Sequence, residues 1–445
     1  MFSSVLAALA LPTLMECQAA ATNPEFVYAQ SVGLQAYSYG FPMVDLHKQK
    51  FNETHWVRED QPVASAVNEI AVYPHLLTPA TQGQLRAPNV DTLYMNAWVD
   101  LSMGPVLVEV PEMGDRYYTL AFMDLYGKPV HIGTRTNQGR AHKYALVGPS
   151  GGATPEGYTV VTLKTDINWM LGRVMAMSAA DEVVAKQLAQ QIRMVGNTGP
   201  APVAAEPANP HASLQFFDVL NQALKTLPPV DGEAALLAGF NQLGIGPGGD
   251  FDITALSESE KLGLGCALVL GPQVLNKNGF KPTRVANGWM ISDKIADPGQ
   301  NYLLRAEIAR GGYINEPEEA MYPASITDNY DEFLRGDRRY QLRFEAGNLP
   351  PVDAFWSITA YDSSTSQLTE NILGRYSIGD RTPGLEYEGD GSLVLVLSAK
   401  PPSTGISNWL PIPEGPFHVV TRLYLPKPSA LSGEYVLPVI ERVKP

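Results

Sequence analysis

The sequence predicts an α+β fold in which two β-rich domains, of sandwich or jelly-roll-like form, are separated by a helical middle segment. Short runs rich in β-branched and aromatic residues, bounded by Gly and Pro, occur before about residue 175 and again after residue 325. Between these two regions, apolar residues recur at helical spacing. Separate blocks of strands and helices are typical of α+β proteins rather than of alternating α/β folds.

The composition is that of a folded, acidic protein. Apolar residues make up 45% of the 445 residues and charged residues only 18%, which excludes a largely disordered chain. The 39 Gly and 36 Pro indicate many turns between short strands. The net charge of −14 argues against nonspecific binding to nucleic acid, so no nucleic-acid partner is predicted.

The first residues resemble a signal peptide. An apolar stretch within residues 1–15 is followed by small residues that end at Ala21. We therefore predict a signal peptide over residues 1–21, cleaved after Ala19 or Ala21, and a protein secreted or otherwise exported through the secretory pathway. The stretch is too short to span a membrane, so no membrane span is predicted. An ordinary buried N-terminal helix is the alternative.

Export also bears on the two cysteines and on glycosylation. Removal of the signal peptide removes Cys17 and leaves Cys266 alone, so no intrachain disulfide is expected. Cys266 lies in the apolar stretch 262–270, where a thiol usually fills space, and we predict that role rather than catalysis. The only glycosylation sequon starts at Asn52 and predicts a glycan there in a eukaryotic secretory pathway.

The N-terminal β-rich domain is predicted over residues 22–175. It opens with a helical pattern from about residue 25 to Pro42, and a polar, turn-rich stretch follows. Runs of β-forming residues then recur at short intervals between Gly and Pro turns, which favours a sandwich or barrel-like sheet. The predicted strands are 106–110, 116–124, 144–147 and 158–163.

The helical middle segment, 176–324, and the C-terminal β-rich domain, 325–445, follow in that order. Ser178 to Asp181 has the pattern of a capping box, and apolar residues at helical spacing come directly after it. Further helices are predicted at 216–224, 232–243, 256–271 and around Arg305. The predicted strands of the C-terminal domain are 340–344, 354–361, 392–397 and 418–424.

Polar residues that suit acid–base chemistry are concentrated in the strands and turns of the N-terminal domain. The residues that stand out are Asn89, Asp91, Tyr94, Arg116, Asp124 and Arg135. Asp, Arg and Tyr side chains brought together can orient a carboxylate or carbonyl and move protons. In the structural alternative, Asp91 caps a turn and the arginines form ion pairs. Spacing alone favours the structural alternative without excluding the catalytic one.

No metal ion or other cofactor is predicted. The seven histidines form no helix-spaced pair, and neither a phosphate-binding Walker sequence nor a dinucleotide fingerprint occurs in a strand–turn–helix setting. The alternative is a metal-dependent enzyme that uses His75 together with Asp91 or Asp124.

Two blocks of the sequence carry a family resemblance. The first includes Pro88–Tyr94, Trp98–Ser102, Arg116–Tyr118 and Gly133–Arg135, and it resembles the domain of unknown function 1254. The second includes Phe355–Thr359, Asn371, Arg375–Ile378, Asn408–Pro411 and Arg422–Tyr424, and it resembles the domain of unknown function 1214. The resemblance implies two β-rich domains in an often exported protein, and it implies no established reaction.

Together these observations predict an exported enzyme that acts on a small organic molecule by acid–base chemistry, without a redox cofactor. Hydrolase, lyase and isomerase reactions all fit, including a tailoring step in natural-product biosynthesis. Asp91 or Asp124 is the predicted base, Tyr94 the acid or hydrogen-bond donor, and Arg116 or Arg135 the anion-binding group. The predicted substrate-binding residues are Asn89, Tyr361, Asn371, Arg375 and Trp409.

The rival prediction is a non-catalytic β-sandwich protein that binds a glycan or another protein through its Tyr and Trp side chains. Aromatic faces and Asn side chains suit carbohydrate contacts, and the same residues also suit a core. A deep pocket that gathers Asp, Tyr and Arg favours the enzyme, whereas a shallow aromatic groove favours binding. The sequence leaves the oligomeric state open, a homo-oligomer included.

Overall fold

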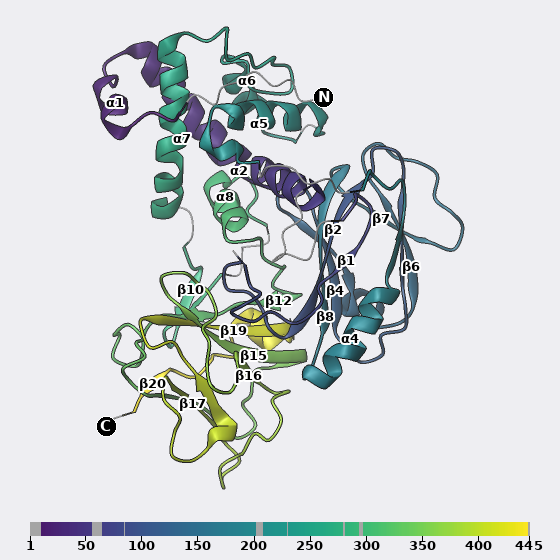
Figure 1. The fold of residues 1–445 in the computed structure, drawn as a ribbon, viewed down its shortest axis with the longest axis vertical. Helices are drawn as coiled ribbons and strands as arrows, with labels where there is room; N and C mark the ends of the chain where they lie inside the picture. The colour runs from purple at the N-terminus through teal and green to yellow at the C-terminus, as the bar shows by residue number, and fades with distance from the viewer. Residues whose placement is uncertain are drawn as a thin grey trace.

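The computed structural model describes residues 10–55, 65–83, 85–201, 208–228, 230–278, 281–292 and 297–443. It has three parts: a helical layer, an N-terminal β-sandwich and a C-terminal β-sandwich (Figure 1). The predicted α+β class is confirmed, with β-rich regions in the N- and C-terminal parts and a helical region between them. None of the described helices combines the length and the apolarity needed to cross a membrane.

The helical layer is built around α2 (Pro24–His55), which is 32 residues long and contains Pro42. The predicted helical pattern therefore continues well past the proline at which it was expected to end. The helices that pack on α2 are α5 (Gln215–Thr226), α6 (Ala234–Asn241), α7 (Glu258–Asn278) and α8 (Tyr302–Arg310). A Cβ atom on Gly263 of α7 would lie 2.7 Å from the carbonyl oxygen of Phe26, so glycine permits the close approach of α7 to α2.

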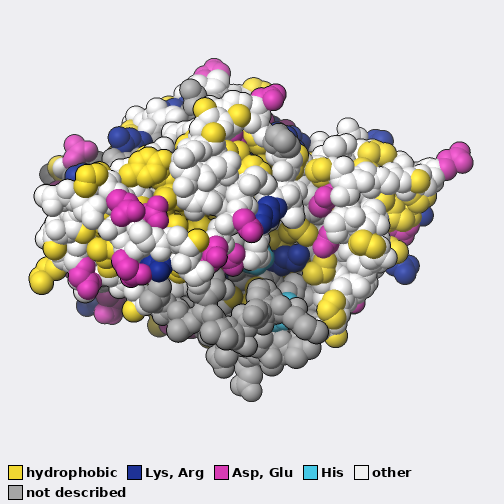
Figure 2. All heavy atoms as spheres, turned by 90° about the horizontal axis from the view of Figure 1, so that it is seen from above, with side chains coloured by type: hydrophobic (Ala, Val, Ile, Leu, Met, Phe, Trp, Pro, Cys, Tyr) yellow, Lys and Arg dark blue, Asp and Glu magenta, His cyan; other side chains and the backbone are white. Residues whose placement is uncertain are grey.

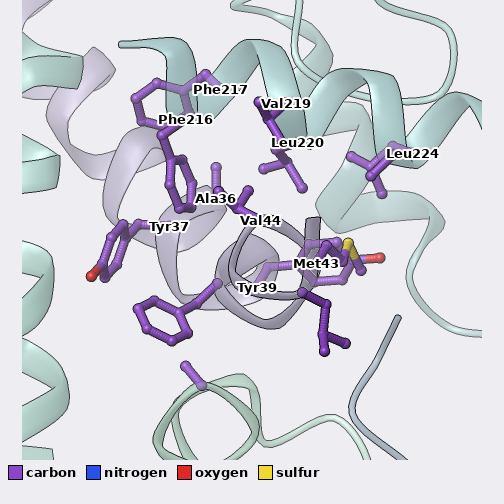
Figure 3. Close-up of a cluster of buried hydrophobic side chains, with 14 of the residues drawn as sticks. Ala36, Tyr37, Tyr39, Met43, Val44, Phe216, Phe217, Val219, Leu220 and Leu224 are labelled. Carbon is purple, nitrogen blue, oxygen red and sulfur yellow. The ribbon is translucent and has the colours of Figure 1, made fainter. Parts of the chain in front are cut away.

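Large apolar side chains fill the space between α2 and α5 (Figure 3). Phe216, Phe217, Leu220 and Leu224 repeat at helical spacing on α5 and are buried, as the sequence pattern predicts. They belong to one core with Ala36, Tyr37, Tyr39, Met43 and Val44 of α2. The same core reaches Trp98 and Trp169, so the helical layer also packs against the N-terminal sandwich.

The N-terminal segment shows that the expected absence of a disulfide was wrong. Cys17 lies in α1 (Leu14–Ala19) and is bonded to Cys266 of α7 across a separation of 249 residues. Thr13 caps α1 in a reciprocal capping box with Glu16. Cys266 therefore does not act as a space-filling thiol. Residues 1–9 of the predicted signal peptide lie outside the described residues.

The N-terminal sandwich packs a five-stranded sheet on a four-stranded sheet. The strand orders are β1-β2-β8-β4-β5 and β7-β6-β3-β9. The strands of the first sheet are β1 (Ala71–Val72), β2 (Thr92–Asp100), β8 (Ile167–Met175), β4 (Tyr118–Met123) and β5 (Pro129–Gly133). Those of the second are β7 (Thr159–Thr162), β6 (His142–Val147), β3 (Val106–Val110) and β9 (Arg193–Val195). Apolar side chains of both sheets form one core between them.

The central strands β2 and β8 are absent from the sequence prediction. In β2, every residue from Thr92 to Val99 is buried, because one face meets the sandwich core and the other meets the helical layer and the C-terminal domain. A strand buried on both faces lacks the alternation of polar and apolar residues that marks a half-exposed strand. By contrast, β3 alternates between buried and partly buried residues, and its predicted bounds are the observed ones.

The C-terminal sandwich has the same two-layer design. Its larger sheet has the order β10-β11-β13-β19-β15-β16, with β12 also paired to β19, and its smaller sheet has the order β18-β17-β14-β20. The larger sheet comprises β10 (Arg284–Ala286), β11 (Trp289–Ile291), β12 (Ala320–Met321), β13 (Ala324–Ser325), β15 (Val352–Asp362), β16 (Ser377–Gly379) and β19 (Phe417–Pro426). The smaller one comprises β14 (Tyr340–Phe344), β17 (Leu393–Ser398), β18 (Trp409–Pro411) and β20 (Glu441–Arg442).

The outer surface carries charges of both signs. Figure 2 shows acidic side chains distributed over the face seen from above, with Lys and Arg interspersed among them rather than gathered in one basic patch. Such a distribution agrees with the net charge of −14. On this face, the charged groups are those expected of a solvated surface.

Candidate functional site

Strand register brings polar and aromatic side chains into the junction between the two sandwiches. In the N-terminal sheet, Arg173 of β8 lies opposite Tyr94 of β2 and Thr119 of β4. In the C-terminal sheet, Arg422 of β19 lies opposite Ser357 of β15. Side chains at alternate positions of a strand share one face, so these strands each present a row of polar groups.

Ring contacts show that the two rows meet. The Tyr117 ring of the N-terminal domain lies 5.6 Å from the Phe355 ring and 5.2 Å from the Tyr424 ring of the C-terminal domain. Five residues from both sides of the junction interact through their charges and rings, and we call them the junction cluster. They are Tyr94, Arg173, Tyr322, Arg422 and Tyr424.

The two arginines of the junction cluster are buried without a carboxylate partner among the described residues. Arg173 is 7% exposed, and its Nη1 donates a hydrogen bond of 3.2 Å to the side-chain oxygen of Asn315. Its guanidinium group lies 5.5 Å from the centroid of the Tyr94 ring. Arg422 is 3% exposed and donates hydrogen bonds to Thr359 Oγ1 and to the Ala87 carbonyl. Buried charges are usually paired, so this arrangement requires an explanation.

Tyr322 and Tyr424 of the junction cluster are neutral proton donors. Burial raises the pKa of Tyr424 and of Tyr322 above the usual value for a phenol. The Tyr424 hydroxyl is buried and has no hydrogen-bond partner within the described part of the chain. The Tyr322 hydroxyl accepts a hydrogen bond from Asn315 Nδ2, and the Tyr94 hydroxyl accepts one from the Asn89 N–H.

His131 of β5 lies on the same face of the N-terminal sheet. Its Nδ1 is 3.0 Å from Thr119 Oγ1, while its Nε2 is buried and makes no hydrogen bond to any described residue. Burial, with smaller effects of Arg135 and Arg173, lowers the pKa of His131 to about 3. The imidazole is therefore neutral near pH 7 and has a nitrogen atom free of protein partners.

Asp91, the first predicted base, is part of this junction but is fully engaged. It is 3% exposed, and its carboxylate accepts hydrogen bonds from Ser357 Oγ at 2.6 Å, Ser377 Oγ at 3.2 Å and Arg381 Nη2 at 2.8 Å. All three donors belong to the C-terminal domain. The ion pair therefore fastens the turn before β2 to the opposite sandwich.

Asn89 and Tyr361 complete the part of the prediction that the structure brings together. Asn89 Oδ1 accepts hydrogen bonds from the N–H groups of Asp91 and Thr92, which fixes the turn before β2. Tyr361 is fully buried, and its hydroxyl donates a hydrogen bond of 2.7 Å to the Pro88 carbonyl. Burial raises the pKa of Tyr361 to about 12. With Tyr94, four of the predicted site residues thus lie at the junction.

Arg116 and Asp124 have structural partners elsewhere, whereas Arg135 borders the junction through Glu319. Arg116 lies before β4 rather than within it and forms a two-point ion pair with Asp181 near the start of α4 (Ala179–Gln191), at 2.7 and 2.6 Å. Asp124 accepts two backbone hydrogen bonds in the turn after β4, and burial raises its pKa. Arg135 donates to Glu319 and Glu316.

The remaining predicted binding residues brace loops of the C-terminal sandwich. Arg375 Nη1 donates hydrogen bonds to the carbonyls of Ile406, Ser407 and Trp409. Asn371 Oδ1 accepts hydrogen bonds from two N–H groups of its own loop. Trp409 is 1% exposed, and its indole N–H donates to the Ser398 carbonyl. These side chains therefore form no exposed aromatic groove.

Other candidates from the sequence lie apart from the junction. His75 is exposed and pairs with Glu182 at 2.8 Å, rather than with Asp91 or Asp124. Across the described ranges, no group of three or more His, Cys, Asp or Glu side chains is arranged to hold a metal ion. Asn52 lies in α2, and its side-chain oxygen accepts a hydrogen bond from the Ala208 N–H.

Two hollows on the described surface also lie outside the junction. One of about 660 Å³ borders β3, β6 and the end of α4, and one of about 270 Å³ borders β14 and β20. Some charged side chains along their walls are already paired at the surface, as Lys143 is with Glu109 and Arg343 with Asp390. Solvated pairs of this kind offer little binding energy, so the junction remains the stronger candidate.

The junction cluster was missed in the sequence because only Tyr94 stands in a polar stretch. Arg173 lies within the apolar run Met170–Met175, and Arg422 lies within the run Val419–Tyr424. An arginine inside an apolar strand is a usable signal, since a buried strand accepts a charge only where something compensates it. The sequence does not show, however, that these two strands belong to sheets that pack at the same junction.

Comparison with protein families assigns the two sides of the junction to two different families. The family described as "Protein of unknown function (DUF1254)" matches residues 67–196, and "Protein of unknown function (DUF1214)" matches residues 319–428. The chain is a DUF1254–DUF1214 protein. The predicted order of the two domains is therefore confirmed. Tyr94 and Arg173 come from the DUF1254 domain, and the other three members of the junction cluster come from the DUF1214 domain.

A solved structure shares the fold. The crystal structure of the VPA0106 protein from Vibrio parahaemolyticus is 25% identical, with a TM-score of 0.68, and the match covers 94% of this chain and 100% of that one. A putative uncharacterized protein from Burkholderia cenocepacia is 14% identical, with a TM-score of 0.45 and coverage of 97% and 98%. No curated protein matches this DUF1254–DUF1214 protein. The likeness to VPA0106 extends over both sandwiches and the helical layer.

Proposed function

We propose that this DUF1254–DUF1214 protein is an enzyme that acts on a small organic molecule by acid–base chemistry in the junction between its sandwiches. One observation carries the proposal: two proton-transfer groups, Tyr424 OH and His131 Nε2, are buried and have no partner among the described residues. A buried polar group left without a hydrogen bond costs about 1–3 kcal/mol of stability. Such groups are retained most readily where a substrate supplies the missing partner.

Each group has a defined role in the proposed reaction. Tyr424, whose pKa burial keeps high, stays protonated and donates a proton or a hydrogen bond. His131 is neutral because burial lowers its pKa to about 3, and Thr119 orients its ring through Nδ1. Its Nε2 then accepts a hydrogen bond from the substrate. Both groups are near Arg173, whose charge acts on each of them.

The residues predicted from sequence take supporting roles in this proposal. Tyr94 lies in the junction cluster and, with its oxygen already accepting the Asn89 N–H, offers its own O–H as a second donor. Asp91 fastens the two domains together instead of removing a proton. Hydrolase, lyase and isomerase reactions all use such a pair of groups, and a tailoring step in natural-product biosynthesis is among them.

Export through the secretory pathway is part of the same proposal. The Cys17–Cys266 disulfide supports it, because disulfides form and persist mainly in oxidising compartments. Cleavage after Ala19 or Ala21 would remove Cys17 from the chain and abolish this disulfide. We therefore propose that a leader peptide, if cleaved, is cleaved before Cys17. Glycosylation of Asn52 stays a prediction.

The proposal is tested by two substitutions and a matched control. The purified protein is incubated with a metabolite extract, and a compound that the unsubstituted protein converts is followed by mass spectrometry. Tyr424→Phe and His131→Asn each lower the rate about 100- to 10,000-fold, the usual contribution of a general acid or base. Tyr340→Phe removes a buried hydroxyl from the C-terminal core and leaves the rate unchanged. Full activity in both site variants overturns the proposed site.

A further inference from the structure

We infer that the junction cluster binds an organic carboxylate through the guanidinium groups of Arg173 and Arg422. This inference deepens the proposed function, because it rests on the same site and names the class of substrate. It depends on the charge, the burial and the unused hydrogen-bond donors of these two side chains.

The first step concerns charge. Arg173 and Arg422 are 7% and 3% exposed, and no carboxylate among the described residues forms an ion pair with either. The nearby acidic groups are committed to other arginines: Asp91 pairs with Arg381 at 2.8 Å, and Glu319 pairs with Arg135 at 2.9 Å. Asp91 acts on Arg422 electrostatically, but neither guanidinium group forms an ion pair with a carboxylate of the described residues. An anion bound at these groups would supply a direct counter-charge.

The second step concerns hydrogen-bond donors. A guanidinium group has five N–H donors in a planar fork that matches the two oxygens of a carboxylate. Within the described chain, Arg173 donates only to Asn315, and Arg422 donates to Thr359 and the Ala87 carbonyl. The Tyr424 hydroxyl adds another buried donor without a partner. Donors outnumber acceptors here, which is the pattern of an anion site rather than of a cation site.

The third step concerns position and access. Arg173 comes from the N-terminal sheet and Arg422 from the C-terminal sheet, and the charges of both act on the Tyr424 phenol. Tyr322 is partly exposed, and Tyr94 and Arg173 are 9% and 7% exposed, so the cluster borders solvent. The Tyr94 and Tyr424 rings provide apolar walls for the carbon skeleton of a compact ligand. A neutral or cationic molecule would leave the two guanidinium groups uncompensated.

Thermal-shift titration of the full chain with benzoate, succinate, inorganic phosphate and benzamide tests the inference. Benzoate or succinate raises the melting temperature in a saturable way, whereas benzamide, the neutral counterpart of benzoate, does not. Arg173→Gln and Arg422→Gln each weaken carboxylate binding at least tenfold. The control Arg343→Gln, which removes an arginine paired on the surface of the C-terminal sandwich, binds as tightly as the unsubstituted protein.

Several results would overturn the inference. They are the absence of a shift with both carboxylates, equal shifts in the arginine and control variants, and a shift with phosphate alone. If a Gln variant does not fold, Arg173→Lys and Arg422→Lys replace it, since lysine keeps the charge but loses the planar fork, and binding should still weaken.

The two ideas can fail separately. Arginine-dependent binding of carboxylates together with full activity of Tyr424→Phe and His131→Asn would refute the proposed chemistry and leave the carboxylate site standing. Conversion of a neutral substrate that depends on His131 and Tyr424 would support the chemistry and refute the carboxylate site.

Discussion

Removal of the disulfide between α1 and α7 should lower the stability of the protein measurably. The bond joins Cys17 of α1 to Cys266 of α7, and both cysteines are buried beside Phe26. The proposed perturbation is the double substitution Cys17→Ser and Cys266→Ser, which leaves no free thiol behind. The same bond is opened in the unsubstituted protein by a reducing agent.

The size of the effect follows from the length of chain that the bond closes. A cross-link restricts the unfolded chain, and the restriction grows with the logarithm of the number of residues enclosed. For a separation of 249 residues, the chain-entropy relation gives about 5.5 kcal/mol at 25 °C. Disulfides in proteins usually deliver about 2–4 kcal/mol, so we expect a loss in that range. With an unfolding entropy of about 2.1 cal/mol/K per residue, a chain of 445 residues loses roughly 1 °C of melting temperature per kcal/mol.

Calorimetry of the oxidised, reduced and doubly substituted proteins measures this effect. We expect the melting temperature to fall by roughly 2–4 °C on reduction or substitution. Reducing agent should leave the double variant unchanged, which serves as the control. Two titratable thiols in the unreduced, denatured protein, or equal melting temperatures for all three samples, would refute the reasoning.

Three further predictions concern packing and charge. Gly263→Ala forces α7 away from α2 and should lower the free energy of unfolding in urea by about 1–3 kcal/mol. Gly239→Ala, in open space on α6, should be neutral or stabilising, and equal effects of the two substitutions would contradict the packing argument. Arg116 lowers the pKa of Asp181, so this pair stabilises the protein above about pH 4, and that stability is lost as pH falls through the lowered pKa. In Arg116→Ala, the free energy of unfolding should therefore depend less on pH in this acidic range. His131, with its pKa near 3, should stay neutral in NMR titration down to about pH 4 and favour unfolding as pH falls from 6.5; protonation near pH 6.5 would refute its burial.

The elements that the sequence predicts well are those whose own side chains define them. Strand β3 alternates along its length, and α5 repeats Phe and Leu at helical spacing, so local patterns determine both. Strands β2 and β8 are buried on both faces, and their patterns depend on the neighbouring layers. Helix α2 continues past Pro42 because packing by four other helices outweighs the local effect of one proline.

The candidate site was only partly predictable for the same reason. Asn89, Asp91 and Tyr94 are close in sequence and lie together in the fold, so their grouping is local information. Arg173 and Arg422 are about 250 residues apart, and only the packing of the two sandwiches lets both charges act on the same tyrosines. The Cys17–Cys266 bond likewise depends on the contact between α1 and α7, which no local pattern reports.

The Asp91–Arg381 ion pair has a consequence for dividing this chain into separate domains. Together with the hydrogen bond from Tyr361 to the Pro88 carbonyl, it joins the two β domains through buried polar contacts. A fragment ending near residue 196 would expose Trp98 and Trp169 to water and would leave the Asp91 carboxylate without its three donors. We therefore expect each domain of this chain, expressed by itself, to be less soluble than the full chain.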